Sequence, residues 1–418
     1  MKRTSRLRAP TVFLLAASLA LGCATTSKGT DQEATSGARP SPDSAQAAAQ
    51  PASQASQKSP ASADPLPSAS AERTKENASR KFSELVDGLS EKDEYFFSDN
   101  LISNETSYMQ TASALDAHKD PTGVYLGVGP EQNFSYIALT RPSLAFVVDI
   151  RRANMLLHLL YRAAFEQAGS RAEFVSVLLG HSFDPAQKEA ASDGVARVLE
   201  LGAKGAASEE SFKAAHLALM TRVEGYGVSL STADQETLKK THRAFFEDQL
   251  ALRFELKEKN GRSYPTLKEL FTTTSPDGKL GGFLATDESF QFIKSMQTQG
   301  RIIPLVGDFA GDKALPELAA YLKAEGKTVH TFYVSNVEQY LLEPKVWKNW
   351  VRNVKALPKD DSSLFVRAYL DQGRKHPKQM KGHRTATVHS KMVDFETSFG
   401  DKPTTTFWAL CTEKMVAP

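Results

Sequence analysis

The chain has 418 residues, with 51 Lys and Arg against 49 Asp and Glu, and 41% of its residues are hydrophobic. This composition is typical of a globular protein with a sizeable core, and it excludes collagen, coiled-coil arrays and wholly disordered chains. The formal net charge of +2 becomes −2 if Lys2, Arg3, Arg6 and Arg8 are removed with a leader peptide. Because phosphate recognition needs a basic surplus or a basic face, nucleic acid is not an expected partner.

Residues 1–22 are expected to be a secretory signal peptide. A basic start is followed by a mostly apolar run at residues 11–21, which is too short to cross a bilayer as a helix. The sequence Leu19-Ala-Leu-Gly-Cys23 resembles the bacterial lipobox, which implies that Cys23 is lipidated and becomes the mature N-terminus. Several acyl chains on one residue would anchor the protein to a membrane. Ala24 after the cysteine implies the outer membrane, facing the periplasm. The alternative is a non-lipidated signal with an incidental cysteine.

Residues 23–78 are expected to be a disordered tether. Ala, Ser, Pro, Gln and Thr dominate this segment, and apart from Ala its one aliphatic or aromatic residue is Leu66. Such a segment cannot offset its ordering entropy by burial. Helical spacing of apolar residues begins at Phe82, so residues 79–418 are expected to form the folded domain. A further helix start is predicted at Ser103-Asn-Glu105.

The folded part is predicted to be an α/β domain with a doubly wound, mostly parallel sheet. Helical patterns separate successive apolar runs, and this alternation is typical of that fold. A mainly helical insertion at about 171–300 would lie between the second and third strands, since it is too long for an ordinary connection. Strands are predicted at residues 123–129, 144–149, 301–308, 328–334 and 363–369.

The residues that follow each predicted strand form the main candidate site, because ligands of open α/β sheets bind at the carboxyl ends of the strands. Glycines permit close approach of the backbone, and an acid after the second strand can accept hydrogen bonds from a ribose. These features predict an adenosine ligand. In chain order the residues are Gly127 and Gly129, then Asp149, then Asp308, then Asn336.

The start of the helix after the first strand favours one class of adenosine ligand. Pro130, expected at the first helical position, lacks an N–H donor, and Glu131 adds negative charge. A pyrophosphate prefers free N–H groups and no acid at a helix start. A cationic sulfonium with a free amino group would therefore fit better, and Glu131 is included among the predicted cofactor-binding residues.

Across roughly residues 100–370, without the insertion, the chain resembles the class I S-adenosylmethionine-dependent methyltransferases. The resemblance implies that Gly127 and Gly129 lie under the methionine moiety, that Asp149 binds ribose and that Asp308 meets the adenine amino group. Residues 336–340, beginning with Asn336, match the motif where substrate and methyl group meet. Parts of the same regions also resemble an uncharacterised family of bacterial proteins, which implies no substrate.

Two departures from the methyltransferase pattern restrict the expected chemistry. The glycine loop lacks its usual leading acid, since Tyr125 and Leu126 precede Gly127. The segment at 335–340 lacks Asn-Pro-Pro-Tyr, which argues against nucleic-acid and amine substrates.

Glu338 and Tyr340 are the predicted catalytic pair, with Glu338 able to take a proton.

Other titratable residues are expected to be structural. Cys411 is expected to be buried, and with Cys23 lipidated no thiolate metal site is predicted. His376, His383 and His389 lie among lysines and arginines, where a solvated basic loop is favoured over a metal site or a site for an anionic polymer.

The sequence therefore predicts an envelope lipoprotein with a methyltransferase-like domain, which would transfer a methyl group from S-adenosylmethionine to an unknown small-molecule or protein acceptor. The periplasm is not expected to contain this cofactor. The alternative is a non-catalytic lipoprotein whose pocket or basic loop binds an envelope component.

Overall fold

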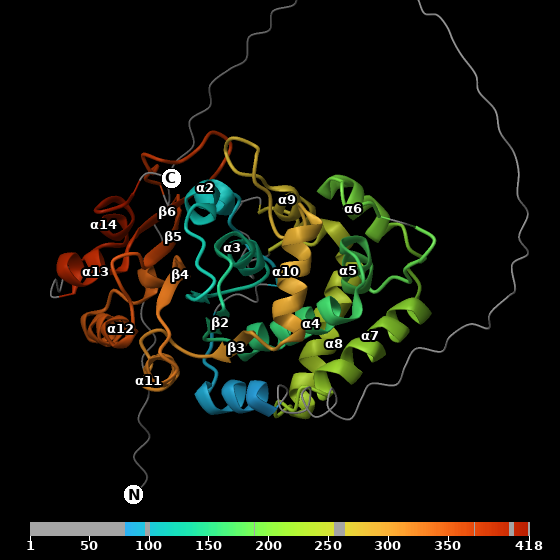
Figure 1. The fold of residues 1–418 in the computed structure, drawn as a ribbon, viewed down its shortest axis with the longest axis horizontal. Coiled ribbons are helices and arrows are strands. Elements are labelled where there is room, and N and C mark those ends of the chain that lie inside the picture. The colour runs from blue at the N-terminus through green and yellow to red at the C-terminus, as the bar shows by residue number, and fades with distance from the viewer. Residues whose placement is uncertain are drawn as a thin grey trace, which may run out of the picture. The chain divides into compact units, whose positions relative to one another are not determined.

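The computed structural model describes residues 80–96, 101–187, 189–254, 264–371, 373–400 and 405–416 (Figure 1). All of them belong to one unit of the chain, residues 66–418. The predicted signal peptide, the tether and Cys23 lie outside the described residues. Within the described ranges no helix combines the length and the apolar character that crossing a membrane requires.

A six-stranded sheet forms the centre of this unit. The strand order is β3-β2-β1-β4-β5-β6, in which β1 to β5 are parallel and β6 is antiparallel to β5. The predicted α/β class with a mostly parallel sheet is therefore confirmed. The strands are β1 (Val124–Gly127), β2 (Leu144–Asp149), β3 (Ile302–Val306), β4 (Val329–Ser335), β5 (Leu364–Leu370) and β6 (Thr385–Lys391).

Helices cover both faces of the sheet, which explains why the central strands are continuous apolar runs. Residues 145–148 of β2 are fully buried. One face carries α3 (Gln132–Thr140), α4 (Arg152–Gln167) and α10 (Asp287–Thr298), and the other carries α11 (Ala314–Ala324), α12 (Pro344–Ala356) and α13 (Met392–Phe399) (Figure 1). Helix α3 begins later than predicted: Pro130, expected at the first helical position, lies in a bend before the N-cap residue Glu131.

The chain between β2 and β3 is helical wherever it is described, apart from short 3-10 and irregular segments and isolated β-bridges. After α4 its elements are α5 (Arg171–Leu178), α6 (Val195–Ala203), α7 (Glu209–Glu224), α8 (Thr232–Asp248), η2 (Gln249–Ala251) and α9 (Leu267–Thr272), followed by α10. Helix α4 is the support of this region, because α5, α7, α8 and α10 all pack against it.

Short elements complete the unit. Residues 80–89 are helical, and residues 90–96 continue without regular structure. The predicted helix start at Ser103 is wrong, because residues 103–105 form a loop. The remaining elements are η1 (Tyr108–Thr111), α2 (Ala112–Asp116), η3 (Val337–Tyr340) and α14 (Phe407–Thr412).

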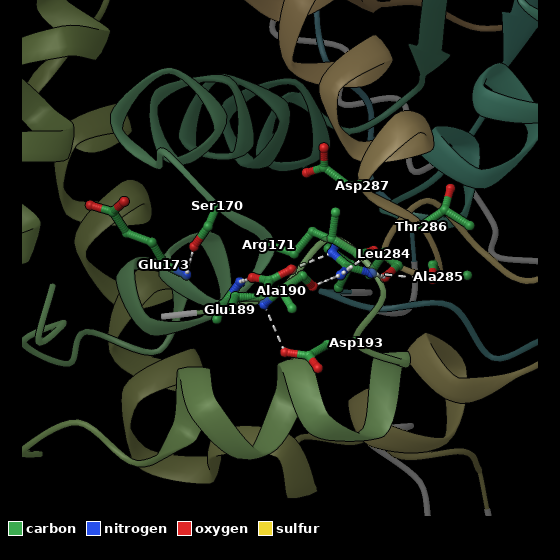
Figure 2. Close-up of polar contacts among 12 residues, drawn as sticks. Ser170, Arg171, Glu173, Glu189, Ala190, Asp193, Leu284, Ala285, Thr286 and Asp287 are labelled. Carbon is green, nitrogen blue, oxygen red and sulfur yellow. Dashed lines mark hydrogen bonds and ion pairs between the residues drawn. The ribbon is translucent and has the colours of Figure 1, made fainter. Parts of the chain in front are cut away.

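A buried ion pair fastens α5 to the loop that precedes α6 (Figure 2). Arg171 is fully buried, and its Nε donates to the carboxylate of Glu189. Its Nη1 donates to the carbonyl oxygens of Leu284 and Ala285, both at 3.2 Å, and its Nη2 donates to that of Ala190 at 3.2 Å. A buried guanidinium is tolerated when its charge and its donors are satisfied in this way. The pairing of Arg171 with Glu189 is therefore a structural contact (Figure 2).

Candidate functional site

A cavity of about 340 Å³ lies at the carboxyl ends of β1, β2, β3 and β4. Strands β1 and β4 are neighbours, but the helices that follow them, α3 and α12, cover opposite faces of the sheet (Figure 1). This is the topological switch point where α/β sheets bind ligands. Among the predicted site residues the lining includes Gly129, Asp149, Asp308, Asn336 and Tyr340. Gly127, Glu131 and Glu338 lie outside the lining formed by the described residues.

The neighbours of Gly127 leave no space for a side chain, and this residue lies outside the described cavity lining. A Cβ atom at this position would lie 1.9 Å from Oδ1 of Asn133 and 2.8 Å from the ring of Tyr125. The Asn133 amide donates to the carbonyl oxygens of Val128 at 2.9 Å and of Pro130 at 2.7 Å. The missing side chain of Gly127 therefore makes room for the amide that shapes the turn after β1.

Of the two glycines predicted to bind the cofactor, Gly129 is the one that lines the cavity. Its φ of +78° favours glycine, and a Cβ atom there would have nothing within 4 Å. Its carbonyl oxygen accepts hydrogen bonds from Asn133 at 3.1 Å, Asn154 at 3.2 Å and His158 at 2.8 Å. Burial lowers the pKa of His158 to about 4, so the neutral ring donates from Nε2. The carbonyl oxygen of Gly129 is therefore occupied by protein donors, and the space beside its Cα is open.

The carboxylate of Asp149 is already paired with Arg151, two residues further along the chain. The backbone N–H of Arg151 donates to Oδ1 at 2.9 Å, and its guanidinium donates to Oδ1 and to Oδ2, each at 3.1 Å. A carboxylate offers about four acceptor positions, so one position on Oδ2 remains for a ligand hydroxyl. Arg152 points elsewhere and pairs with Asp234 at 2.8 Å.

The segment at residues 90–96 runs along the ends of β2 and β3. Its Glu91 donates its N–H to the carbonyl oxygen of Val306 at 3.0 Å and accepts the N–H of Asp308 at 2.5 Å. Glu94 donates its N–H to the carbonyl oxygen of Ile150 at 3.1 Å. An N–H that a ligand at Asp308 could use is therefore occupied by a side chain of this segment.

Phe96 and Tyr340 form an aromatic wall of the cavity. Their rings meet edge to face with centroids 5.4 Å apart, and both residues line the cavity. Tyr340, predicted to be catalytic, is 46% exposed, and partial burial raises its pKa. Its position suits packing against a ligand ring.

The role predicted for Glu338 is corrected by its surroundings. The side chain is fully buried, and its two carboxylate oxygens accept hydrogen bonds from Nε and Nη2 of Arg367. Nε1 of Trp350 donates to Oε1 at 3.1 Å. Since the carboxylate faces a guanidinium and lies outside the cavity lining, Glu338 is a structural ion-pair partner rather than a proton acceptor for a substrate.

Glu105 is a buried glutamate that does line the cavity, and the sequence prediction missed it. It is 1% exposed. Its Oε1 accepts the hydroxyl of Tyr333 at 2.8 Å and that of Ser335, and its Oε2 accepts Nε2 of Gln132 at 3.1 Å. Burial raises the pKa of this carboxyl, and the three neutral donors oppose that shift.

Ser335 adds a strained backbone position to this group. Its φ is +52°, a left-handed conformation that costs energy for a residue with a side chain, and the pairing of β4 with β5 is irregular there. The bend directs the hydroxyl of Ser335 toward Glu105. Strained residues of this kind cluster at functional sites.

Glu131 lies behind the cavity wall, which corrects its predicted contact with the cofactor. It is 2% exposed, and its Oε1 accepts the N–H of Ser103 at 3.2 Å. Its Oε2 has no hydrogen-bond partner among the described residues. Burial, reinforced by the charge of Glu105, raises the pKa of Glu131 to about 7.

The local sequence around Glu105 carries no signal for this site. Its partners Tyr333 and Ser335 are 228 and 230 residues away in the chain. The pattern at Ser103 was compatible with a helix cap, which hid the loop. One available signal was that the glycine loop lacks its usual leading acid. An acid from another part of the chain could have been sought in its place.

The predicted solvated basic loop is wrong for two of its three histidines. His376 is 2% exposed and bonds the carbonyl oxygen of Cys411 at 3.0 Å, whereas His389 is 5% exposed within β6. His383 is partly buried beside Thr106. Cys411 is buried, as predicted. In the described part of the chain no group of three or more His, Cys, Asp or Glu is placed to hold a metal ion.

Comparison with known proteins gives a family without an assigned activity. Residues 100–415 match the family described as "Domain of unknown function (DUF7790)". No curated protein matches the chain. Every described residue that lines the cavity falls within the matched range except Phe96.

Proposed function

We propose that this chain, which belongs to the DUF7790 family of domains of unknown function, binds S-adenosylmethionine in the cavity and transfers its methyl group to an acceptor. The observation that carries the proposal is the meeting of Gly129, Asp149 and Asp308 in one cavity at the switch point of the sheet. This is where a doubly wound sheet binds a nucleoside.

The chain's own groups suit such a ligand in part. Gly129 allows close approach of the ligand to the backbone, and the remaining acceptor position of Asp149 can take one ribose hydroxyl. Tyr340 and Phe96 supply an aromatic wall for a flat ring. The bound cofactor would supply the electrophilic methyl group. Methyl transfer depends mainly on alignment, so the residues need to orient the two reactants and exclude water.

A second candidate function is favoured by the contacts of the two carboxylates: Asp149 accepts from Arg151, and Asp308 accepts the N–H of Ala310 at 2.9 Å. In that alternative the protein is a non-catalytic envelope lipoprotein, anchored to the outer membrane through Cys23, and the cavity holds an envelope component. Both acids of the predicted adenosine site would then serve the fold.

Calorimetric titration of S-adenosylmethionine and S-adenosylhomocysteine into the full chain tests the proposal. We expect Asp149→Asn to weaken binding about tenfold or more, because it removes a charged acceptor. Asp234→Asn is the matched control, since Asp234 is equally buried and pairs with Arg152 away from the cavity. Absence of binding at millimolar ligand, or equal losses in the two variants, would reject methyl transfer at this site.

Fractionation distinguishes the second candidate. Membrane-bound protein that external protease degrades in spheroplasts, together with no binding of either adenosyl ligand, would support the envelope-binding alternative. Protein recovered in the cytoplasm would contradict it.

A further inference from the structure

The described lining of the cavity contains more acidic than basic side chains. Its lining contains the carboxylates of Glu105, Asp149 and Asp308. Among the described lining residues the basic side chain is Arg151, and its guanidinium already pairs with Asp149. The charge of Glu105 therefore has no cationic partner within the described lining.

The hydrogen bonds of Glu105 leave room for one more donor. Oε1 already accepts two hydroxyls, whereas Oε2 accepts one amide N–H. With about two acceptor positions on each oxygen, one position on Oε2 remains. A carboxylate buried with neutral donors alone is costly to ionise, and a positive group beside it would remove much of that cost.

We infer that the ligand of this cavity carries an ammonium group that binds Oε2 of Glu105. The inference rests on the proposed function for the position of the ligand, and it adds the chemical class of the group at this end of the cavity. Two sources have the same chemistry: the amino-acid end of an adenosyl cofactor, and a separate amine acceptor. An amine acceptor would differ from the expectation drawn from the missing Asn-Pro-Pro-Tyr motif.

The protonation of Glu105 is coupled to ligand binding. Burial favours its neutral form in the free protein, and an ammonium favours its ionised form, so the ligand releases a proton from Glu105 to solvent wherever the free carboxyl is protonated. The titratable groups whose charges interact with Glu105 come from the turn before α3, from β1, from α3 and from β4. They are Glu131, Tyr125, Tyr136 and Tyr333.

Two ligand pairs test the inference on the full chain by calorimetry. S-adenosylhomocysteine carries an ammonium that 5′-methylthioadenosine lacks, and n-hexylamine carries one that n-hexanol lacks. We expect Glu105→Gln to weaken the ammonium-bearing member of at least one pair about tenfold and its uncharged partner less than about twofold. The proton released on binding appears as a dependence of the enthalpy on the buffer, and Glu105→Gln abolishes it.

Two further variants control for folding and for general charge effects. Glu105→Asp keeps the charge but withdraws the carboxylate, so it is expected to weaken the ammonium ligand less than Glu105→Gln. Asp371→Asn removes a carboxylate from an adjoining hollow, outside the lining of this cavity, and is expected to change no affinity. Unfolding midpoints of all variants report whether they fold.

The outcomes separate this inference from the proposed function. If Glu105→Gln selectively weakens the binding of S-adenosylhomocysteine, the ammonium belongs to the cofactor. If it selectively weakens the binding of n-hexylamine, the ammonium belongs to an amine acceptor. If both adenosyl ligands bind and Glu105→Gln weakens neither member of either pair selectively, the inference is overturned while the proposed function stands. If neither adenosyl ligand binds, the proposed function fails, and the hexylamine pair alone decides the inference.

Discussion

Two buried glutamates near the end of β4 differ in what neutralises them. Glu338 is fully buried against the guanidinium of Arg367, whereas Glu105 is 1% exposed and receives only hydroxyl and amide donors. Glu338 lies outside the cavity lining, and Glu105 lies within it. Burial therefore does not separate the two residues. The presence of a counter-charge within the protein separates a carboxylate that holds the fold from one that is available to a ligand.

The Glu189–Arg171 pair resembles the Glu338–Arg367 pair. It is buried, its donors are satisfied, and it joins segments of the helical region (Figure 2). Two buried ion pairs therefore have a structural role, whereas the buried carboxylate of Glu105 lines the cavity and pairs with no cation of the described lining.

The largest expected effect comes from removing the counter-charge of Glu338. Arg367→Met leaves the carboxylate buried without a cation, and we expect the free energy of unfolding to fall by about 3–5 kcal/mol. Denaturant unfolding measures it. Glu105→Gln, which removes no cation, is expected to change stability by less than about 1 kcal/mol.

Adding Glu338→Gln to Arg367→Met should recover much of the lost stability, because the double variant buries no charge. A loss below about 1 kcal/mol in Arg367→Met would remove the distinction between the two glutamates.

An intermediate effect is expected at Glu131, which has no cationic partner among the described residues and lies outside the described cavity lining. Its folded pKa of about 7 exceeds its unfolded value, so between pH 4.5 and 7 the folded state binds the extra proton. Stability is therefore lost as pH rises through this range, by up to about 3 kcal/mol. Glu131→Gln should flatten this slope and raise stability at pH 8.

Denaturant unfolding of both proteins from pH 4 to pH 8 measures the slopes. His158 works in the opposite direction, since its lowered pKa makes stability rise with pH between about 4 and 6.5. Subtracting the profile of the variant from that of the natural chain isolates Glu131. Parallel profiles would show that Glu131 is not protonated in the folded protein.

The smallest expected effect concerns the bend that aims a donor at Glu105. Ser335→Gly and Ser335→Ala both remove the hydroxyl, but only the glycine variant relieves the left-handed backbone at φ +52°. We expect Ser335→Gly to be more stable than Ser335→Ala by about 1 kcal/mol. Thermal unfolding compares them, and equal stabilities would mean that position 335 is not strained.

The local patterns identified five of the six strands because each of those strands is a short apolar run. β6 was missed because basic residues surround it and its Thr385-Ala-Thr-Val-His run was interpreted together with them. Its pairing with β5 buries these residues, an outcome that depends on a neighbouring strand.

The candidate site was predicted in part, and the reason lies in the sequence separation of its contacts. Residues that follow strands were expected to meet, and Gly129, Asp149, Asp308 and Asn336 do line one cavity. Two side-chain pairings were not predicted. Arg367 lies 29 residues from Glu338, and Arg151, only two residues from Asp149, pairs with it because of the way its side chain is packed.

The α/β class, the mostly parallel sheet and the position of the cavity at the carboxyl ends of the strands were predictable from the sequence, because they follow from local apolar periodicity and from chain order. The three-dimensional packing was needed to show which acids line the cavity and which of them have a cationic partner. Glu105 meets Tyr333 across 228 residues of chain, and Glu338 meets Arg367 across 29. Whether these two buried glutamates are neutralised depends on contacts between separate elements, which no local pattern encodes.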